Sequence, residues 1–261
     1  TLKRFSDASY KGWVKFNDRS ELYFDTIQDK FPIRSFPLDK YENKRGLVEI
    51  FQMPKRNEDD TIISNRYIAG IDVVDKARAT TTSLPSLIVF DRVTRTIVAE
   101  YTGRTDDPKY FYEVCRRVLM FYKATAMYEQ NFIGLFNYLI QHSASYLLAE
   151  TPYQLRNSDT YRPGTNTSKG IFNSGRINDT GIDYISSWLL SPINNDSDKL
   201  MLNTIYSPAI LKELISWNPK GNFDRVSALI MLFWYEETLH KVKTEMSEAK
   251  VSFLESKYFT K

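Results

Sequence analysis

The sequence predicts an α/β fold with a mixed sheet, in which an antiparallel three-strand meander is joined by parallel strands and flanked by helices. Three observations predict it. Residues 67–74 are apolar on both faces, which is typical of a central strand. Residues 84–90 and 96–101 are rich in Val and Ile, and the short polar turn between them indicates a hairpin. A helix and a short apolar segment, residues 124–129, follow, so a crossover can return the chain parallel to the first strand.

The region before this meander has a different character. We interpret residues 1–60 as an extension packed on the main domain, because prolines and charged clusters interrupt its short apolar runs. Residues 46–53 are its one expected strand, and the charged stretch 55–60 marks the boundary. The main domain then spans residues 61–241, and the charged residues 242–261 are expected to form a peripheral tail.

Two helices are expected around the parallel strand. Asp107 suits an N-cap and Pro108 suits the first helical position, and an apolar stripe follows as far as Tyr122. A second helix is expected over residues 132–148.

The carboxyl-terminal part is expected to alternate loops and helices. Residues 156–183 are polar and turn-rich, and residues 182–190 predict a short helix or strand. Residues 207–217 predict a helix. A last helix is expected to be capped by Asn222 and to continue to about His240.

Composition sets limits on function. The chain has 261 residues, a net charge of +3 and a pI near 8.7, which permits binding to a polyanion without requiring it. The single cysteine, Cys115, excludes a disulfide within the chain and a cysteine-based zinc site, and its helical spacing predicts a buried core residue. His142 and His240 are isolated and make a poor metal site. The sequence has no secretory signal and no apolar run that spans a bilayer, so we expect a cytoplasmic setting.

Asp72 is the most unusual residue, because it lies in a run that should be buried. An ionised carboxylate there is costly unless it is paired or binds a metal. Strand geometry places Gly70 on the same face, and we expect it to leave open space beside the carboxylate. The alternative is that Asp72 ends the strand and accepts backbone hydrogen bonds from the following turn.

Two further acids lie at the ends of predicted elements. Glu129 follows the expected parallel strand, and Asp224 lies in the first turn of the last helix, where the small residues Ser227 and Ala228 would leave room for an ion. For each acid alone, the alternative is interaction of its carboxylate with a helix dipole, and for Glu129 in isolation this alternative is preferred. The three together can converge on one crevice and hold hard divalent cations.

Four segments, taken in order, resemble the nuclease domain of phage terminase large subunits over residues 61–241. They are residues 67–72, the hairpin 88–104, the turn 128–134, and Asn222-Phe-Asp-Arg-Val-Ser-Ala-Leu229 preceded by Leu211-Lys-Glu-Leu214. The resemblance implies a ribonuclease-H-like fold and two-metal cleavage of double-stranded DNA. Asp72, Glu129 and Asp224 match the acidic triad, with Asp72 bridging two Mg²⁺ or Mn²⁺ ions.

The sequence departs from the family at several positions. Asp75 is the nearest match to a fourth acid, but its loop lacks the usual glycines. Phe223 stands where relatives often have a second acid, and Gln130 replaces a more usual Asn. The chain has no phosphate-binding loop of the Gly-x-x-x-x-Gly-Lys-Ser/Thr type and no initial Met, so we expect an isolated nuclease half that does not hydrolyse ATP.

Loop cations near the expected site are candidates for phosphate contact. Residues 168–183 resemble a β-hairpin that lies beside the active site in the family, which favours Lys169 and Arg176. The full set of candidates is Lys76, Arg78, Arg156, Arg162, Lys169 and Arg176. For each of them singly, a solvated loop charge is the alternative.

The resemblance also implies partners and a setting. The partners are double-stranded DNA, the terminase ATPase domain, the portal and the small terminase subunit, without a membrane, in the cytoplasm of the infected bacterial host. Two alternatives remain open: another ribonuclease-H-like nuclease, such as a junction resolvase or transposase core, and a non-catalytic DNA-binding packaging module.

Overall fold

One mixed sheet organises the molecule. A computed structural model describes residues 9–39, 43–74, 83–104, 106–156, 168–194 and 198–254, with side chains up to residue 244. The strands are β1 (Tyr10–Phe16), β2 (Leu22–Thr26), β3 (Val48–Ile50), β4 (Tyr67–Asp72), β5 (Ser86–Asp91), β6 (Thr96–Thr102) and β7 (Thr125–Tyr128). Their order in the sheet is β2-β1-β3-β6-β5-β4-β7, and all neighbours are antiparallel except β4 and β7.

The predicted fold class is confirmed. Strands β4, β5 and β6 form the antiparallel meander, and β7 returns parallel to β4 after helix α2 (Pro108–Tyr122), as the sequence predicts. Asp107 caps α2 by accepting a hydrogen bond from the backbone N–H of Lys109. The parallel pairing continues through isolated bridges from Ala126 to Leu148 and from Glu129 to Ile171.

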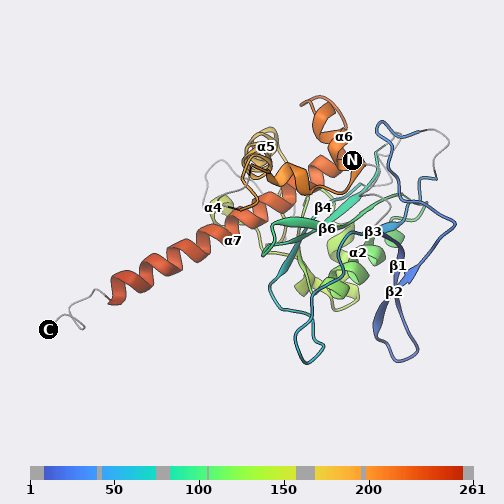
Figure 1. The fold of residues 1–261 in the computed structure, drawn as a ribbon, viewed down its shortest axis with the longest axis horizontal. Coiled ribbons are helices and arrows are strands. Elements are labelled where there is room, and N and C mark those ends of the chain that lie inside the picture. Colours follow the sequence, from blue (N-terminus) through green and yellow to red (C-terminus); the bar gives the residue numbers. More distant parts are fainter. Residues whose placement is uncertain are drawn as a thin grey trace.

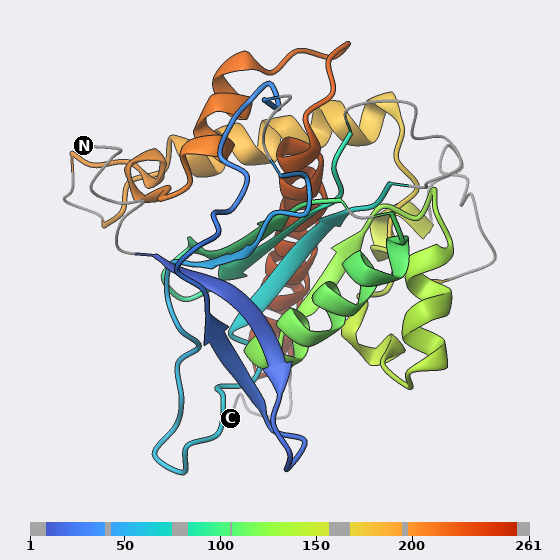
Figure 2. The ribbon, with the colours of Figure 1, turned by 90° about the vertical axis from the view of Figure 1, so that its right-hand side faces the viewer.

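Helices cover both faces of the sheet. One face carries α2 and α3 (Gly134–Gln141), and the other carries α5 (Gly175–Leu189), α6 (Pro208–Ser216) and α7 (Asp224–Leu254). Figure 2 shows α2 and α7 on opposite sides of the strands. The short helices are α4 (Tyr153–Arg156) and the 3₁₀ turns at Ser145–Leu147 and Met201–Thr204. Since β4 to β6 are buried on both faces, they show no polar alternation.

The amino-terminal residues extend the same sheet. The expected strand within residues 46–53 is present as β3, which pairs with β6. Strands β1 and β2, which the sequence does not predict, form a hairpin that pairs with β3 and makes the sheet edge. Their side chains are largely half-exposed, so the apolar pattern that identifies a strand is weak there.

Several predicted helix boundaries are wrong. The second helix ends at Gln141 instead of near residue 148, because Ser143 adopts a positive φ of 52° and the chain turns back toward β7. The segment that resembles a β-hairpin at residues 168–183 makes only isolated bridges before α5 begins at Gly175. Helix α7 continues past His240 to Leu254, and its end projects away from the sheet (Figure 1). No helix in the described part of the chain is long and apolar enough to cross a membrane.

Candidate metal centre

Asp72 is the last residue of β4, and only 7% of it is exposed. The open space expected beside it at Gly70 is absent. A Cβ on Gly70 would lie 2.0 Å from the backbone oxygen of Ala228 and 2.6 Å from the nitrogen of Leu232. The glycine therefore allows the backbone of α7 to pack directly on β4, and the small residues of α7 bring helix and strand together instead of making room for an ion. This close packing brings the start of α7 toward the end of β4.

Glu129 directly follows β7 and lies beside Asp72. Its backbone N–H donates to Ile71 O (3.1 Å), which continues the parallel pairing of β7 with β4. The Asp72 and Glu129 carboxyls are close enough for each to shift the pKa of the other.

Asp224 is the first residue of α7, and both of its side-chain oxygens accept hydrogen bonds. Ser83 Oγ donates to Oδ1 (2.6 Å), and the backbone N–H of Leu84 donates to Oδ2 (3.0 Å). The Asn222 side chain donates to Oδ2 at 3.4 Å. The residues that precede β5 thus hold the third acid at the same edge of the sheet as the other two.

The cap of α7 differs from the prediction. Glu213 of α6, rather than Asn222, accepts hydrogen bonds from the backbone N–H groups of Arg225 (2.8 Å) and Val226 (3.3 Å). Its other oxygen lies 2.8 Å from Nη1 of Arg225. Arg225 also donates to Ile33 O and lies 3.9 Å from Glu100. The buried Glu213–Arg225 pair therefore fixes the start of α7 and, with it, the position of Asp224.

The electrostatics of the three acids are unfavourable without a cation. Burial raises the pKa of Asp72 well above its usual range, and the Glu129 and Asp224 carboxyls raise it further. Burial also raises the pKa of Glu129. The side chains of Asp72 and Asn173 partly oppose this rise, because they favour the charged form of Glu129. Burial raises the pKa of Asp224, with opposition from Ser83, Leu84 and Arg225. A bound cation would offset this cost and favour the ionised form of the three carboxyls.

The three carboxyls are not close enough to one another to coordinate a shared metal ion as they stand. Among the described residues, no three His, Cys, Asp or Glu side chains are gathered closely enough to hold a metal ion as they stand. Both carboxylate oxygens of Asp224 are engaged by hydrogen bonds from Ser83 and Leu84. The donor set consists of hard oxygens, which suits Mg²⁺ or Mn²⁺, and Asp224 would exchange these bonds to reach a shared ion.

Asn173 is a candidate site residue that sequence reasoning missed. Its side-chain nitrogen donates to Glu129 Oε2 (3.4 Å), and its backbone N–H donates to Asn131 (2.9 Å). Its amide oxygen is buried and has no hydrogen-bond partner among the described residues. The bridge between Ile171 and Glu129 brings it there, and no local motif marks it.

The remaining predicted site residues have different placements. Asp75, Lys76, Arg78 and Arg162 lie outside the described residues. Lys169 bonds to Leu148 O (2.7 Å) and pairs with Glu150 (3.1 Å), so its amine is engaged within the protein. Arg156 ends α4, and Arg176 lines a cavity beside α5.

Comparison with known proteins finds similarity among solved structures only. Crystal structures of the large terminase nuclease from thermophilic phage G20c match with bound zinc (TM-score 0.46), without a named metal (0.45) and with bound magnesium (0.42). Each is 13% identical to this chain, and the matches cover 77–78% of this chain and 90% of the other. No protein-family model matches, and no curated protein matches significantly.

Proposed function

We propose that this chain is a divalent-metal-dependent endonuclease that cleaves double-stranded DNA as the nuclease part of a viral DNA-packaging motor. The observation that carries the proposal is the convergence of three buried acids from separate elements. Asp72 ends β4, Glu129 follows β7 and Asp224 starts α7, and Asp72 interacts with both of the others. The order and placement of these acids agree with the sequence resemblance to terminase nucleases.

The residues of the proposed site would have different roles in metal binding. Asp72, whose pKa both other acids raise, is the candidate for a ligand shared by two ions, and Glu129 and Asp224 would each hold one. Mg²⁺ or Mn²⁺, when bound, supplies activation of a water and stabilisation of the leaving 3′ oxygen in an in-line displacement at phosphorus. Ser83 would release Asp224 on loading, while Asn173 continues to orient Glu129.

The proposed setting follows from the same resemblance. In an infected bacterial cell, the partners would be double-stranded DNA, the ATPase domain, the portal and the small terminase subunit. Asp75, Lys76, Arg78, Lys169 and Arg176 remain candidates for a fourth metal ligand and for phosphate contacts. The engagement of Lys169 with Glu150 implies that it would contact DNA only after breaking that pair.

Plasmid cleavage in Mn²⁺ tests the activity. We expect wild type and Asp18→Asn, which changes an exposed hairpin acid, to nick the plasmid, and Asp72→Asn to lose at least a hundredfold in rate. Equal nicking by Asp72→Asn would refute the metal triad. A preference for four-way junctions over linear duplex would favour a resolvase. Duplex binding without cleavage in Mg²⁺ or Mn²⁺ would favour a non-catalytic packaging module.

Metal binding provides a readout apart from activity. Calorimetry with Mn²⁺ should show binding to wild type and to Asp18→Asn, and at least tenfold weaker binding to Asp224→Asn. Unchanged binding to Asp224→Asn would remove this residue from the ligand set.

A further inference from the structure

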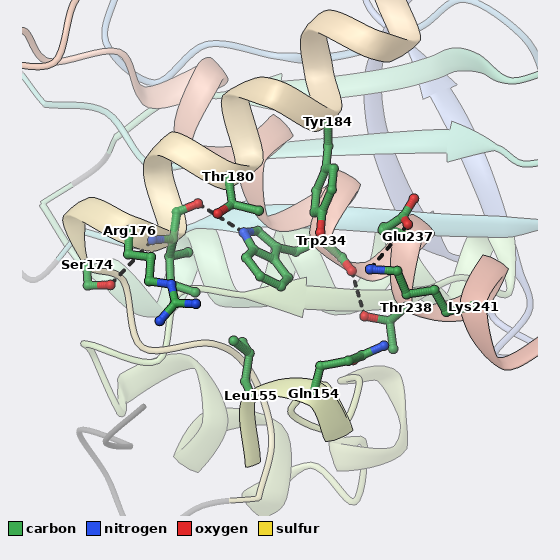
Figure 3. Close-up of a pocket in the computed structure, with 11 residues that line it drawn as sticks. Gln154, Leu155, Ser174, Arg176, Thr180, Tyr184, Trp234, Glu237, Thr238 and Lys241 are labelled. Carbon is green, nitrogen blue, oxygen red and sulfur yellow. Dashed lines mark hydrogen bonds and ion pairs between the residues drawn. The ribbon is translucent and has the colours of Figure 1, made fainter. Parts of the chain in front are cut away.

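Two cavities outside the metal centre differ in how far their charged side chains are already engaged. In the cavity between α4, α5 and α7, Lys241 pairs with Glu237 at 3.4 Å (Figure 3). The second cavity, of about 370 Å³, lies between β1, residues 29–32 and residues 43–46. Its volume is within the range of small-molecule sites, about 300–1,000 Å³. The cations that line this second cavity make no ion pair among the described residues, so it is the better candidate for an anionic ligand.

The backbone of Arg45, which lines the second cavity, is held in place on β6. Its N–H donates to Asn43 Oδ1 (3.0 Å), and its carbonyl oxygen accepts a hydrogen bond from Tyr101 Oη (2.9 Å). A Cβ on Gly103 would lie 2.3 Å from the same carbonyl oxygen, so a glycine is needed there for the two segments to approach this closely. The loop before β3 is therefore anchored, and the side chain of Arg45 starts from a fixed point.

The guanidinium of Arg45 lies over two aromatic rings. Its central carbon is 4.5 Å from the ring centroid of Tyr110 and 5.9 Å from that of Trp13. The two rings, from α2 and β1, meet edge-on with centroids 5.6 Å apart and planes at 85°, and Figure 2 shows these two elements side by side. Arg45 is exposed, and its guanidinium makes no hydrogen bond or ion pair within the described part of the chain. The rings thus support a charge whose N–H groups can bind a phosphate.

An exposed aromatic ring lines the same cavity. Phe31 is 67% exposed, and Lys11 Nζ lies 5.8 Å from its ring centroid. Lys30 and Arg45 are the cations of the lining, and Asp29 is its acidic residue, so the lining carries a net positive charge. An exposed ring beside cations is typical of surfaces that bind single-stranded nucleic acids, where bases stack on the ring and phosphates contact the cations.

The cavity lies at the same end of the sheet as the metal centre. Strand β3 begins beside the end of β6, which lies beside the start of β5 and the end of β4. Arg45 precedes β3 and Asp72 ends β4, so about three strand spacings, or roughly 15 Å, separate them across the sheet. A strand held at the cavity would therefore reach the metal centre along this edge. This link to the metal centre rests on the proposed nuclease function, whereas binding at the cavity does not.

We propose that this cavity binds one nucleotide of a single-stranded nucleic acid, with its phosphate at Arg45 and Lys30 and its base stacked on Phe31. The binding should weaken with salt, because each phosphate contact releases counterions, and should tolerate any base, because every base has a π face. The site needs no divalent ion.

Fluorescence anisotropy in EDTA tests the proposal with three labelled probes: a strand of ten deoxythymidines, an abasic strand of the same length and a DNA duplex. We expect the thymidine strand to bind at least fivefold more tightly than the abasic strand, because only the former can stack a base. Equal binding of the two strands would overturn the proposal, as would the absence of thymidine-strand binding at low salt.

The stacking contact is tested by Phe31→Ala. This change should weaken binding of the thymidine strand about tenfold, remove its advantage over the abasic strand and leave duplex binding unchanged. Tyr146→Ala, which removes a ring of similar exposure (63%) from the turn after α3, should bind all three probes like wild type. If Phe31→Ala binds the thymidine strand like wild type, or loses duplex binding to the same extent, no base stacks there and the proposal is wrong.

The phosphate contact is tested by Arg45→Gln. This change should weaken both single strands about tenfold and reduce the slope of log K against log salt by about 0.7, the value for one phosphate contact on a single strand. Arg19→Gln, the matched loss of an exposed charge in the β1–β2 turn, should change neither quantity. Unchanged binding by Arg45→Gln would contradict the proposal. Phe31 and Arg45 are exposed, so thermal melts should show both variants folded, and Asp72→Asn should bind the thymidine strand like wild type, which separates this site from the metal centre.

Discussion

Glu213 illustrates how one buried side chain can determine where a candidate metal ligand lies. It caps α7 through two backbone N–H groups and pairs with Arg225, the residue next to Asp224. We predict that Glu213→Gln lowers the free energy of unfolding by about 3 kcal/mol, because it leaves the buried Arg225 charge without its nearest partner. Urea denaturation measures this loss. Glu237→Gln, which breaks the exposed pair with Lys241, should change stability by less than about 0.5 kcal/mol, and equal losses would contradict the prediction.

Glu113 on α2 predicts a dependence of stability on pH. Burial opposes its ionisation, but hydrogen bonds from Arg116, Arg117 and Tyr138 outweigh burial and lower its pKa from 4.5 to about 2. A lowered pKa in the folded state stabilises the protein above pH 4.5, and this contribution is lost as the pH falls through about 2. Wild type should exceed Glu113→Gln by about 2 kcal/mol at neutral pH, after allowance for partial exposure. Urea titrations that show the same difference at pH 7 and pH 2 would refute it.

Some candidate site residues can be recognised from their neighbours in the sequence, and others can be recognised only in the folded structure. Asp72 and Glu129 interrupt or end apolar strand segments, and Asp224 starts a strong helix, so each could be found from its neighbours along the chain. Ser83, Asn173 and Glu213 could not, because each reaches its partner from a distant segment. Polar residues in loops and on helices give no signal of such a role until the chain is folded.

At the scale of elements, the contact between β4 and α7 determines the site. A Cβ on Gly70 would overlap the backbone of α7. Gly70→Ala should therefore destabilise the protein by about 2–3 kcal/mol and weaken Mn²⁺ binding, because α7 carries Asp224 and must move away from β4. Gly175→Ala, in the first turn of α5, meets no atom within 4 Å and should leave the Tm unchanged or slightly raised. Thermal melts and calorimetry on the pair check this, and a neutral Gly70→Ala would contradict the close packing.

The sequence predicted helices and strands correctly where the apolar residues repeat with a clear period. It failed where glycines or polar residues interrupt that period. The meander and α2 have strong patterns and are present as expected. In α5, Gly175 and Gly181 suggest turns, yet Gly181 lies within the helix, where its missing side chain lets Ile230 of α7 approach. A glycine that permits close helix packing and a glycine that permits a turn look the same in a single sequence.

At the scale of the whole molecule, folding and metal binding are expected to be separable. The sheet is buried between two extensive apolar cores, one under α2 and α3 and one under α5 and α7. EDTA should therefore leave the protein folded, which distinguishes it from small domains that need a structural metal to fold. The candidate centre is a cluster of buried acids at the ends of β4, β7 and α7, outside these cores.

This separation predicts that Mn²⁺ adds stability that the scaffold does not require. An ion that binds only the folded chain stabilises it by about 2.7 kcal/mol at a hundredfold excess over its Kd. Calorimetric melts of wild type should therefore rise with Mn²⁺ concentration, and Asp18→Asn should follow wild type. Asp72→Asn should melt at or above wild type in EDTA, because it removes one buried carboxylate from a repulsive cluster, but should show little increase with Mn²⁺. If Mn²⁺ stabilised Asp72→Asn as much as wild type, the ion would be binding elsewhere, and the assignment of Asp72 as the shared ligand would be wrong.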